Sequence, residues 1–296
     1  MILFASPGFE RAAALLKERA PNLRPGAFRV ERFSNGELVV RLQTPVSGES
    51  CAILASISPP EEHLASTLLA AHTLQKEGAS EIIAALPYLA YSRQDKDKPG
   101  ESLAIRWIGA LMRASGVTRV VTVDIHSPRD AQLFAIPLLS VSPATVFAEA
   151  LRQYQPGGAT IVAPDEGAIP RCEALIEAAG LAPVAIPYFE KHRDEGGIHH
   201  ARFVGQAGAN VVLVDDILDT GATLISACRR LLSDGVRNIQ IMITHGLFTG
   251  KEWTGLWDLG VSRIFVTDTV PLPAELHESR IVMLPACQLL CQELAG

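Results

Sequence analysis

The chain contains few cysteines, and they are scattered. Its 296 residues include five, an odd number, at positions 51, 172, 228, 287 and 291. Only Cys287 and Cys291 are close, four residues apart as on one face of a helix, and no histidine or third cysteine joins them nearby. We therefore expect buried thiols, which pack as small apolar side chains, rather than a metal-binding pair. Reduced thiols are typical of a cytoplasmic protein.

Long apolar runs and basic blocks are also missing. No apolar run approaches the ~18–20 residues that span a bilayer. Residues 1–7 have no basic residue before their apolar stretch, so they predict a first strand and not a signal peptide. The formal net charge is -6 and no basic block stands out, which argues against a nucleic-acid partner. Hydrophobic residues make up 48% and charged residues 20%, which argues against disorder.

Short apolar runs alternate with helical patterns along the chain. The runs are continuous in Val, Ile, Leu and Ala, as in parallel strands covered on both faces. This alternation indicates an α/β fold of mostly parallel sheets flanked by helices. The predicted strands are 51–57, 81–87, 119–124, 159–163, 182–186, 210–215, 239–244 and 263–267, and the predicted helices are 63–77, 103–115, 170–179 and 223–233.

The length and an internal similarity predict two related domains. Domains cluster around ~100–150 residues, so a chain of this length favours two. In both 116–126 and 235–245, a Gly-Val turn leads through an apolar strand to a histidine just past its end. We expect an N-terminal α/β domain over residues 1–145 and a C-terminal one over 146–296. The sequence leaves open whether a C-terminal helix packs back on the first domain.

Residues 211–224 carry the strongest functional signal. An apolar strand ends in two carboxylates, Asp215 and Asp216, and Asp219-Thr-Gly-Ala-Thr223 then opens an amphipathic helix. Ligands of open α/β sheets bind at the carboxyl ends of strands, and a helix N-terminus favours phosphate. Adjacent carboxylates can accept hydrogen bonds from neighbouring hydroxyls. A diol with a phosphate describes ribose 5-phosphate.

A plainer interpretation exists for the same residues. Asp219 or Thr220 could simply cap the helix, and the paired carboxylates could be a solvated strand end. Capping does not explain two adjacent acids directly after four apolar residues, so the ligand interpretation is favoured.

The segment resembles the phosphoribosyl-diphosphate-binding loop shared by type I phosphoribosyltransferases and ribose-phosphate diphosphokinases. The resemblance implies that seven residues bind ribose 5-phosphate: Asp215, Asp216, Asp219, Thr220, Gly221, Ala222 and Thr223.

Further segments are similar to the diphosphokinases alone, also called phosphoribosyl diphosphate synthetases. They occur in the family's order, and Lys191-His-Arg193 lies where the family carries Lys-x-Arg on a mobile loop. Together they favour a diphosphokinase over a transferase, which lacks the first two. The four segments are Phe33-Ser-Asn-Gly-Glu37, Pro87-Tyr-Leu-Ala-Tyr-Ser-Arg-Gln-Asp-Lys96, Asp124-Ile-His126 and Ala163-Pro-Asp-Glu-Gly167.

By this resemblance the first two segments bind ATP. Phe33 would stack on adenine, Glu37 would accept a hydrogen bond from its amino group, and Arg93 would contact phosphate. From the residues alone, Phe33 could be a core aromatic and 93–96 a solvated loop. The implied ATP-binding residues are Phe33, Asn35, Gly36, Glu37, Arg93, Gln94 and Asp95.

The resemblance also implies a magnesium site and a catalytic pair of cations. His126 and Asp165 would help to hold Mg²⁺, although this ion prefers oxygen ligands and a lone histidine after a strand is commonly just hydrogen-bonded. The anomeric hydroxyl of the sugar attacks the β-phosphorus of ATP, and AMP leaves. Lys191 and Arg193 would stabilise the negative charge of that transition state. Without the resemblance, they could equally belong to a charged surface loop.

The sequence departs from the family pattern at three places. Asn35 replaces an aspartate, residues 127–134 differ from the usual Gln-x-Gln-Gly-Phe-Phe, and Ala168 replaces a glycine. The expected partners are ATP, ribose 5-phosphate and further copies of the chain in a dimer-based homo-oligomer, with no nucleic acid and no membrane. Two alternatives stay open: a phosphoribosyltransferase acting on a base, and a non-catalytic regulatory paralogue.

Overall fold

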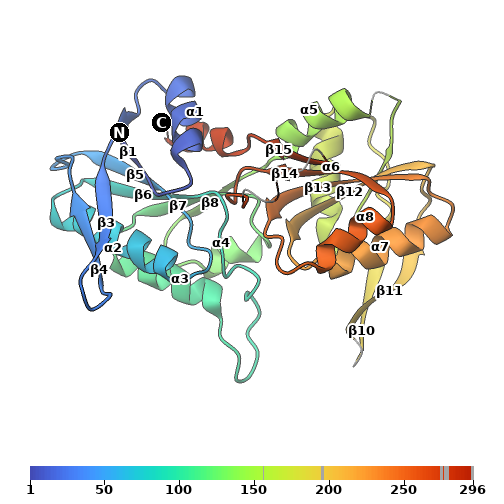
Figure 1. The fold of residues 1–296 in the computed structure, drawn as a ribbon, viewed down its shortest axis with the longest axis horizontal. Coiled ribbons are helices and arrows are strands. Elements are labelled where there is room, and N and C mark those ends of the chain that lie inside the picture. The colour runs from blue at the N-terminus through green and yellow to red at the C-terminus, as the bar shows by residue number, and fades with distance from the viewer. Residues whose placement is uncertain (156, 195–196, 274–275, 277–279, 295–296) are drawn as a thin grey trace. The chain divides into compact units, whose positions relative to one another are not determined.

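The computed structural model describes residues 1–155, 157–194, 197–273, 276 and 280–294, and over 191–201 it describes the backbone alone. The chain forms two compact units (Figure 1). The N-terminal unit comprises Met1–Val141 with Ala286–Gly296, and the C-terminal unit comprises Ser142–Pro285. Each contains a parallel sheet with helices, which confirms the predicted α/β class. Within the described ranges, no helix is long and apolar enough to cross a membrane.

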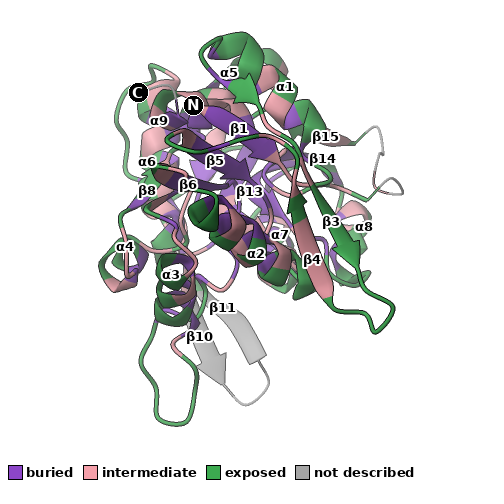
Figure 2. Cartoon of the chain, turned by 90° about the vertical axis from the view of Figure 1, so that its left-hand side faces the viewer, coloured by how far each residue is buried: buried purple, intermediate pink, exposed green. Residues whose placement is uncertain are grey.

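The N-terminal unit is built on a six-stranded sheet of order β2-β1-β5-β6-β7-β8, in which every pairing is parallel. The central strands β5, β6 and β7 are buried from their second residue onward (Figure 2), which explains their continuous apolar sequence. The strands are β1 (Ile2–Ala5), β2 (Arg24–Pro25), β5 (Ser50–Leu54), β6 (Glu81–Leu86), β7 (Arg119–Val123) and β8 (Leu138–Val141), and the helices are α1 (Glu10–Arg19), α2 (Glu62–Lys76), α3 (Ala104–Ala114) and α4 (Arg129–Leu133).

A separate antiparallel hairpin projects from this unit. It consists of β3 (Phe28–Arg32) and β4 (Leu38–Leu42), which pair from Phe28 opposite Leu42 to Arg32 opposite Leu38. Most of its residues are exposed or half-buried, as Figure 2 shows. The hairpin therefore presents its turn, residues 33–37, away from the core.

The C-terminal segment completes the core of the N-terminal unit. The 3-10 helix η4 (Cys287–Leu290) and the helix α9 (Cys291–Leu294) bury Cys287, Leu290 and Leu294 in the same cluster as Leu16 of α1. Four of the five cysteines are buried free thiols and Cys291 is half-buried. Burial raises the pKa of Cys51 to about 11 and that of Cys228 to about 12, so both stay protonated at neutral pH.

The C-terminal unit contains a five-stranded parallel sheet of order β15-β14-β13-β12-β9. Along β12, Val211 and Leu213 face one core, whereas Val212 and Val214 face another on the opposite side. Two covered faces explain why this strand has no polar alternation. The elements are α5 (Ala144–Tyr154), β9 (Thr160–Val162), α6 (Ile169–Ala178), β12 (Asn210–Leu218), α7 (Ala222–Ser233), β13 (Asn238–Gly246), α8 (Gly255–Asp258), β14 (Val261–Thr267) and β15 (Ile281–Leu284).

Two local predictions differ from the structure. The strand predicted at 182–186 is absent, and this stretch has no regular secondary structure. Pro183 and Pro187 lack the N–H that a strand ladder requires. The segment of Lys191 and Arg193, which the resemblance places on a mobile loop, has the paired backbone of an antiparallel hairpin, β10 (Tyr188–Asp194) with β11 (Gly197–Val204). Phe189, which is fully buried, anchors the base of this hairpin against Phe203 at a ring distance of 4.8 Å.

Candidate functional site

The loop between β12 and α7 has the geometry of an anion-binding helix start. The N-cap residue of α7 is Gly221, whose φ of +83° lies in the left-handed region. A Cβ at Gly221 would lie 2.9 Å from Cα of Trp253, so only glycine fits. Because glycine has no side chain to cap the helix, the first N–H groups of α7 are not satisfied by their N-cap residue. This arrangement suits a phosphate.

The chain after β13 fixes this loop in place. Its backbone N–H groups donate three hydrogen bonds: Leu247 and Phe248 to the carbonyl of Leu218, at 2.8 and 3.0 Å, and Thr249 to that of Asp219, at 3.2 Å. Thr220 and Ala222 are exposed, and Asp219 and Thr223 are half-buried. The predicted phosphate-binding residues therefore lie on a rigidly held turn at the carboxyl edge of the sheet.

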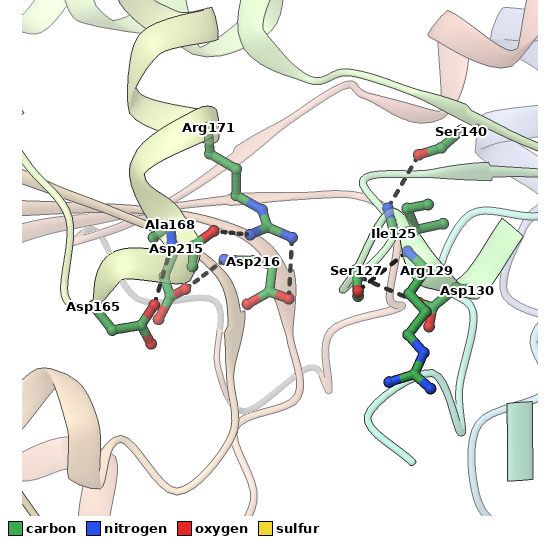
Figure 3. A network of polar contacts seen from close by, with 11 residues as sticks. Ile125, Ser127, Arg129, Asp130, Ser140, Asp165, Ala168, Arg171, Asp215 and Asp216 are labelled. Carbon is green, nitrogen blue, oxygen red and sulfur yellow. Dashed lines mark hydrogen bonds and ion pairs between the residues drawn. The ribbon is translucent and has the colours of Figure 1, made fainter. Parts of the chain in front are cut away.

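The two predicted sugar-binding carboxylates lie at the end of β12 (Figure 3). The backbone N–H of Asp216 donates to Oδ1 of Asp215 at 3.0 Å. Arg171 of α6 donates from Nη2 to Oδ2 of Asp216 at 3.3 Å and from Nη1 to the carbonyl of Gly167 at 3.4 Å. Asp216 is only 6% exposed, so the interpretation of this residue as a solvated strand end is wrong.

The carboxyl of Asp215 is surrounded by protein, although the residue as a whole is half-buried. This burial raises the pKa of Asp215 well above its usual range, and the negative charges of Asp216 and Asp165 raise it further, whereas Arg171 acts in the opposite direction. The two adjacent aspartates thus have different environments. The carboxyl of Asp215 lies near two other acids, and that of Asp216 is paired with a guanidinium.

We expect Asp215→Asn to stabilise the unliganded protein more as the pH rises. A raised pKa means that the folded state retains a proton which the unfolded state releases above its own pKa of about 3.9. Asp215 therefore lowers the free energy of unfolding progressively as the pH rises from about 3.9 through the pKa that Asp215 has in the folded state. Calorimetric melting should show a larger gain in Tm for the variant at about pH 8 than at about pH 5. Asp258→Asn, an exposed acid in the same unit, gives the baseline. An equal gain at both pH values would contradict the raised pKa.

Asp165 begins a tight turn after β9. Its Oδ1 accepts a hydrogen bond from the N–H of Ala168 at 3.2 Å, which caps the 3-10 helix η1 (Glu166–Ala168). Ala168 is 1% exposed and joins the core, which explains how this position accommodates alanine in place of the family's glycine. The carboxylate oxygens here are of the kind that Mg²⁺ prefers. Among the residues that the structure describes, no three His, Cys, Asp or Glu side chains are grouped to hold a metal by themselves.

The turn of the β3–β4 hairpin is well ordered by its own hydrogen bonds. The N–H of Phe33 donates to the carbonyl of Glu37 at 2.9 Å, and the N–H of Gly36 donates to that of Phe33 at 2.8 Å. Oδ1 of Asn35 accepts from the N–H of Glu37 at 3.1 Å, a role that an aspartate oxygen would also fill. Phe33 is 51% exposed, so the alternative of a core aromatic is wrong.

The second predicted ATP segment follows β6. Arg93 is exposed, whereas Asp95 is buried, at 7% exposure, so the alternative of a wholly solvated loop is wrong for this residue. Gln94 has a structural role, because its Oε1 accepts from Oγ of Ser102 at 2.6 Å and its carbonyl accepts from the N–H of Ile105 at 3.5 Å. Tyr91 has a φ of +70°, a strained conformation that often marks a functional loop.

His126 is exposed and follows the end of β7. The preceding residue, Ile125, donates its N–H to Oγ of Ser140 at 3.1 Å (Figure 3). The segment 127–134, which departs from the family pattern, forms α4. The N–H of Ser127 donates to Oδ2 of the buried Asp130 at 3.2 Å, and Arg129 is exposed. The departure thus forms a short, mostly exposed helix in which Asp130 is buried.

Lys191 and Arg193 lie on β10, opposite His200 and Ile198 of β11, with a register shift between Glu190 and Lys191. The side chains of both predicted catalytic residues lie outside the described part of the chain. Arg171 was not predicted as a site residue. Its sequence signal is weak, because an arginine in the first turn of a helix has many ordinary explanations and its partner Asp216 is 45 residues away.

Comparison with known proteins identifies both units. Residues 3–116 match the N-terminal domain of ribose phosphate pyrophosphokinase, and residues 131–273 match the phosphoribosyl transferase domain. A ribose-phosphate pyrophosphokinase of Methanopyrus kandleri is 34% identical, with 100% of both chains aligned, and one of Gloeobacter violaceus is 30% identical over 94% of this chain and 84% of its own. Phosphoribosylpyrophosphate synthetase from Mycobacterium smegmatis has a similar crystal structure, with a TM-score of 0.87 at 25% identity over 99% of this chain and 97% of its own. The chain therefore belongs to the ribose-phosphate pyrophosphokinase family, the diphosphokinases that its motifs resemble.

Proposed function

We propose that the chain transfers the β,γ-diphosphoryl group of ATP to the anomeric hydroxyl of ribose 5-phosphate and releases phosphoribosyl diphosphate and AMP. The similarity of the whole chain to a ribose-phosphate pyrophosphokinase is the observation that carries this proposal. The proposed reaction accounts for the features of both units. In the C-terminal unit, paired carboxylates lie beside a helix start that suits a phosphate. The N-terminal unit carries the segments that resemble an ATP site. No specific observation favours a transferase acting on a base.

The C-terminal unit would bind the sugar. The first N–H groups of α7, with the hydroxyls of Thr220 and Thr223, would bind the 5-phosphate, because a helix start attracts anions. Asp215 and Asp216 would accept hydrogen bonds from sugar hydroxyls. Gly221 and Ala222, with no bulky side chain, would let the phosphate approach the backbone. Asp219 would line the same loop.

The N-terminal unit would bind ATP. The exposed ring of Phe33 offers a stacking surface for adenine, and Glu37 in the same turn would accept from the amino group of the base. Asn35 and Gly36 shape this turn. Arg93, exposed in the loop after β6, would contact phosphate, and Gln94 and Asp95 would hold that loop in position.

The oxygen donors of this chain suit Mg²⁺, which would be bound by the protein and by the substrate phosphates together. Mg²⁺ is commonly bound through one or two carboxylates together with substrate phosphates and waters. Asp165 would supply a carboxylate and His126 a further donor, directly or through water. When bound, the ion would neutralise charge on the phosphates. We further propose that the protein is cytoplasmic, because its cysteines are free thiols. As the resemblance implies, it would form a homo-oligomer built from dimers.

Lys191 and Arg193 would act on the transferred group. Negative charge spreads over its oxygens in the transition state, and two cations brought by the β10–β11 hairpin would stabilise it. Closure of this hairpin over the substrates would also exclude water.

The nucleotide product tests the proposed reaction. The purified protein is mixed with ATP, Mg²⁺ and ribose 5-phosphate, and nucleotides are separated by chromatography. AMP should form only when the sugar is present. Formation of ADP instead would indicate transfer of a single phosphoryl group and would contradict the proposal. Binding of the sugar phosphate without AMP would leave a transferase or a regulatory paralogue.

Phe33→Ala is expected to weaken ATP without destabilising the protein. Stacking of an aromatic ring on a base is worth ~1–3 kcal/mol, so KM for ATP should rise about 5- to 150-fold, while KM for ribose 5-phosphate changes little. The ring is half-exposed, so Tm should be nearly unchanged. Steady-state kinetics with each substrate varied in turn measures this. Val30→Ala, an exposed apolar residue on the same hairpin, serves as the control. Equal KM values for ATP in wild type and Phe33→Ala would refute the stacking role.

A further inference from the structure

Arg171 connects two segments that both belong to the proposed sugar site. Its guanidinium bonds to the carbonyl of Gly167, in the turn after β9, and to the carboxylate of Asp216, at the end of β12. The strands β9 and β12 are parallel neighbours in the sheet. One side chain from the first turn of α6 therefore ties together the loop that carries Asp165 and the strand end that carries Asp216 (Figure 3).

This ion pair is protected from water. The side chains of Arg171 and Asp216 are 16% and 8% exposed. Those of the surface pair formed by Arg230 of α7 and its C-cap residue Asp234 are 50% and 36% exposed. Exposed pairs of that kind contribute little, because water screens the charges and both side chains stay mobile. A buried pair is screened much less. The Arg171–Asp216 contact is therefore able to restrict the carboxylate to one position.

The neighbouring acid is held by a different contact. The carboxyl of Asp215 accepts a hydrogen bond from the backbone N–H of Asp216, whereas Arg171 holds the side chain of Asp216. The second contact of Arg171, to the carbonyl of Gly167, keeps its guanidinium from rotating away. A binding group that is already oriented loses less conformational entropy when a ligand arrives.

We propose that Arg171 is a positioning residue of the sugar site, which holds the Asp216 carboxylate ready to accept a hydrogen bond from a hydroxyl of ribose 5-phosphate. This role rests on the proposed function for the identity of the sugar. Arg171 acts through Asp216, so its contribution disappears when Asp216 can no longer serve as a charged acceptor. A role in maintaining the fold alone would not show this dependence.

A double-mutant cycle on ribose 5-phosphate binding tests this role. Isothermal titration gives Kd for wild type, Arg171→Met, Asp216→Asn and the double variant. Arg171→Met keeps an unbranched side chain and removes the charge. We expect it to raise Kd about 10- to 100-fold in the wild-type background and by less than about twofold in the Asp216→Asn background. Arg171→Lys should give an intermediate Kd, because an ammonium keeps the charge without the planar geometry.

Controls separate the possible causes. Arg230→Met, which breaks the surface pair of the same unit, should leave Kd unchanged. Circular dichroism checks folding, and Arg171→Lys replaces Arg171→Met in the cycle if the latter is unfolded. An equal rise in Kd in both backgrounds, or no rise in wild type, would overturn the role of Arg171.

AMP release by wild type is measured on the same preparation. Binding without AMP would overturn the proposed reaction alone, and no binding would overturn both.

Discussion

Replacing Lys191 by alanine is expected to lower kcat for AMP formation by about 10³-fold or more, because a cation that stabilises charge on a transferred phosphoryl group commonly contributes this much. KM for ribose 5-phosphate should change little, since the lysine acts on charge that develops in the transition state. Steady-state rates of AMP release with both substrates varied measure the two parameters.

The control for this result is Lys76→Ala, which removes an exposed lysine of α2. It should leave kcat unchanged. Arg193→Ala should resemble Lys191→Ala, because both cations lie on β10. A kcat for Lys191→Ala within about tenfold of wild type would mean that the lysine does not act on the transferred group.

Gly221→Ala is expected to abolish measurable use of ribose 5-phosphate. The new Cβ would meet the backbone of Trp253 at 2.9 Å, and the residue has a φ of +83°. The N-terminus of α7 must then shift or the φ must change, and either disturbs the N–H groups that would bind phosphate. We expect kcat/KM to fall by more than about 100-fold, since displacing catalytic geometry by about 1 Å can have that effect.

Gly235→Ala is a matched control at the other end of the same helix. Gly235 has a similar φ of +92°, but a Cβ there would meet nothing within 4 Å. Both variants should lose ~1 kcal/mol or more of stability from the unfavourable φ. Gly235→Ala should nevertheless retain the kcat/KM of wild type. If it lost as much activity as Gly221→Ala, the effect would be general destabilisation rather than damage to the phosphate loop.

The central strands and the loop between β12 and α7 could be predicted because their sequence signals are local. The strand expected at 210–215 is observed as β12 (Asn210–Leu218), and the helix expected at 223–233 is observed as α7 (Ala222–Ser233). A continuous apolar run, a pair of acids and a glycine before an amphipathic helix are all contained within a few residues. Gly221, which the structure places at the N-cap of α7, could likewise be singled out from the sequence, and its role in binding phosphate stays a prediction.

The two hairpins could not be predicted, because cross-strand pairing rather than apolar pattern stabilises them. β10 reads Tyr-Phe-Glu-Lys-His-Arg-Asp, which has the composition of a charged loop. Its position depends on Phe189 and on the ring contact of Phe189 with Phe203 of β11. The strand wrongly expected at 182–186 shows the opposite error. Its apolar content suggested a strand, but Pro183 within the stretch and Pro187 just after it do not allow one.

The role of Arg171 depends on distant parts of the chain for a similar reason. Only the parallel pairing of β9 with β12 brings the turn after one strand next to the end of the other. The difference between Asp215, which lies near Asp165, and Asp216, which is paired with Arg171, also depends on tertiary contacts. From the sequence alone the two residues looked equivalent.

The fate of the terminal phosphates of ATP tests the proposed reaction most directly. ATP carrying ³²P at the γ position is incubated with wild-type protein, Mg²⁺ and ribose 5-phosphate, and the products are separated by thin-layer chromatography. The proposed reaction places the label in phosphoribosyl diphosphate, together with an equal amount of unlabelled AMP. Label in a sugar bisphosphate with ADP, or in free phosphate independent of the sugar, would contradict diphosphoryl transfer.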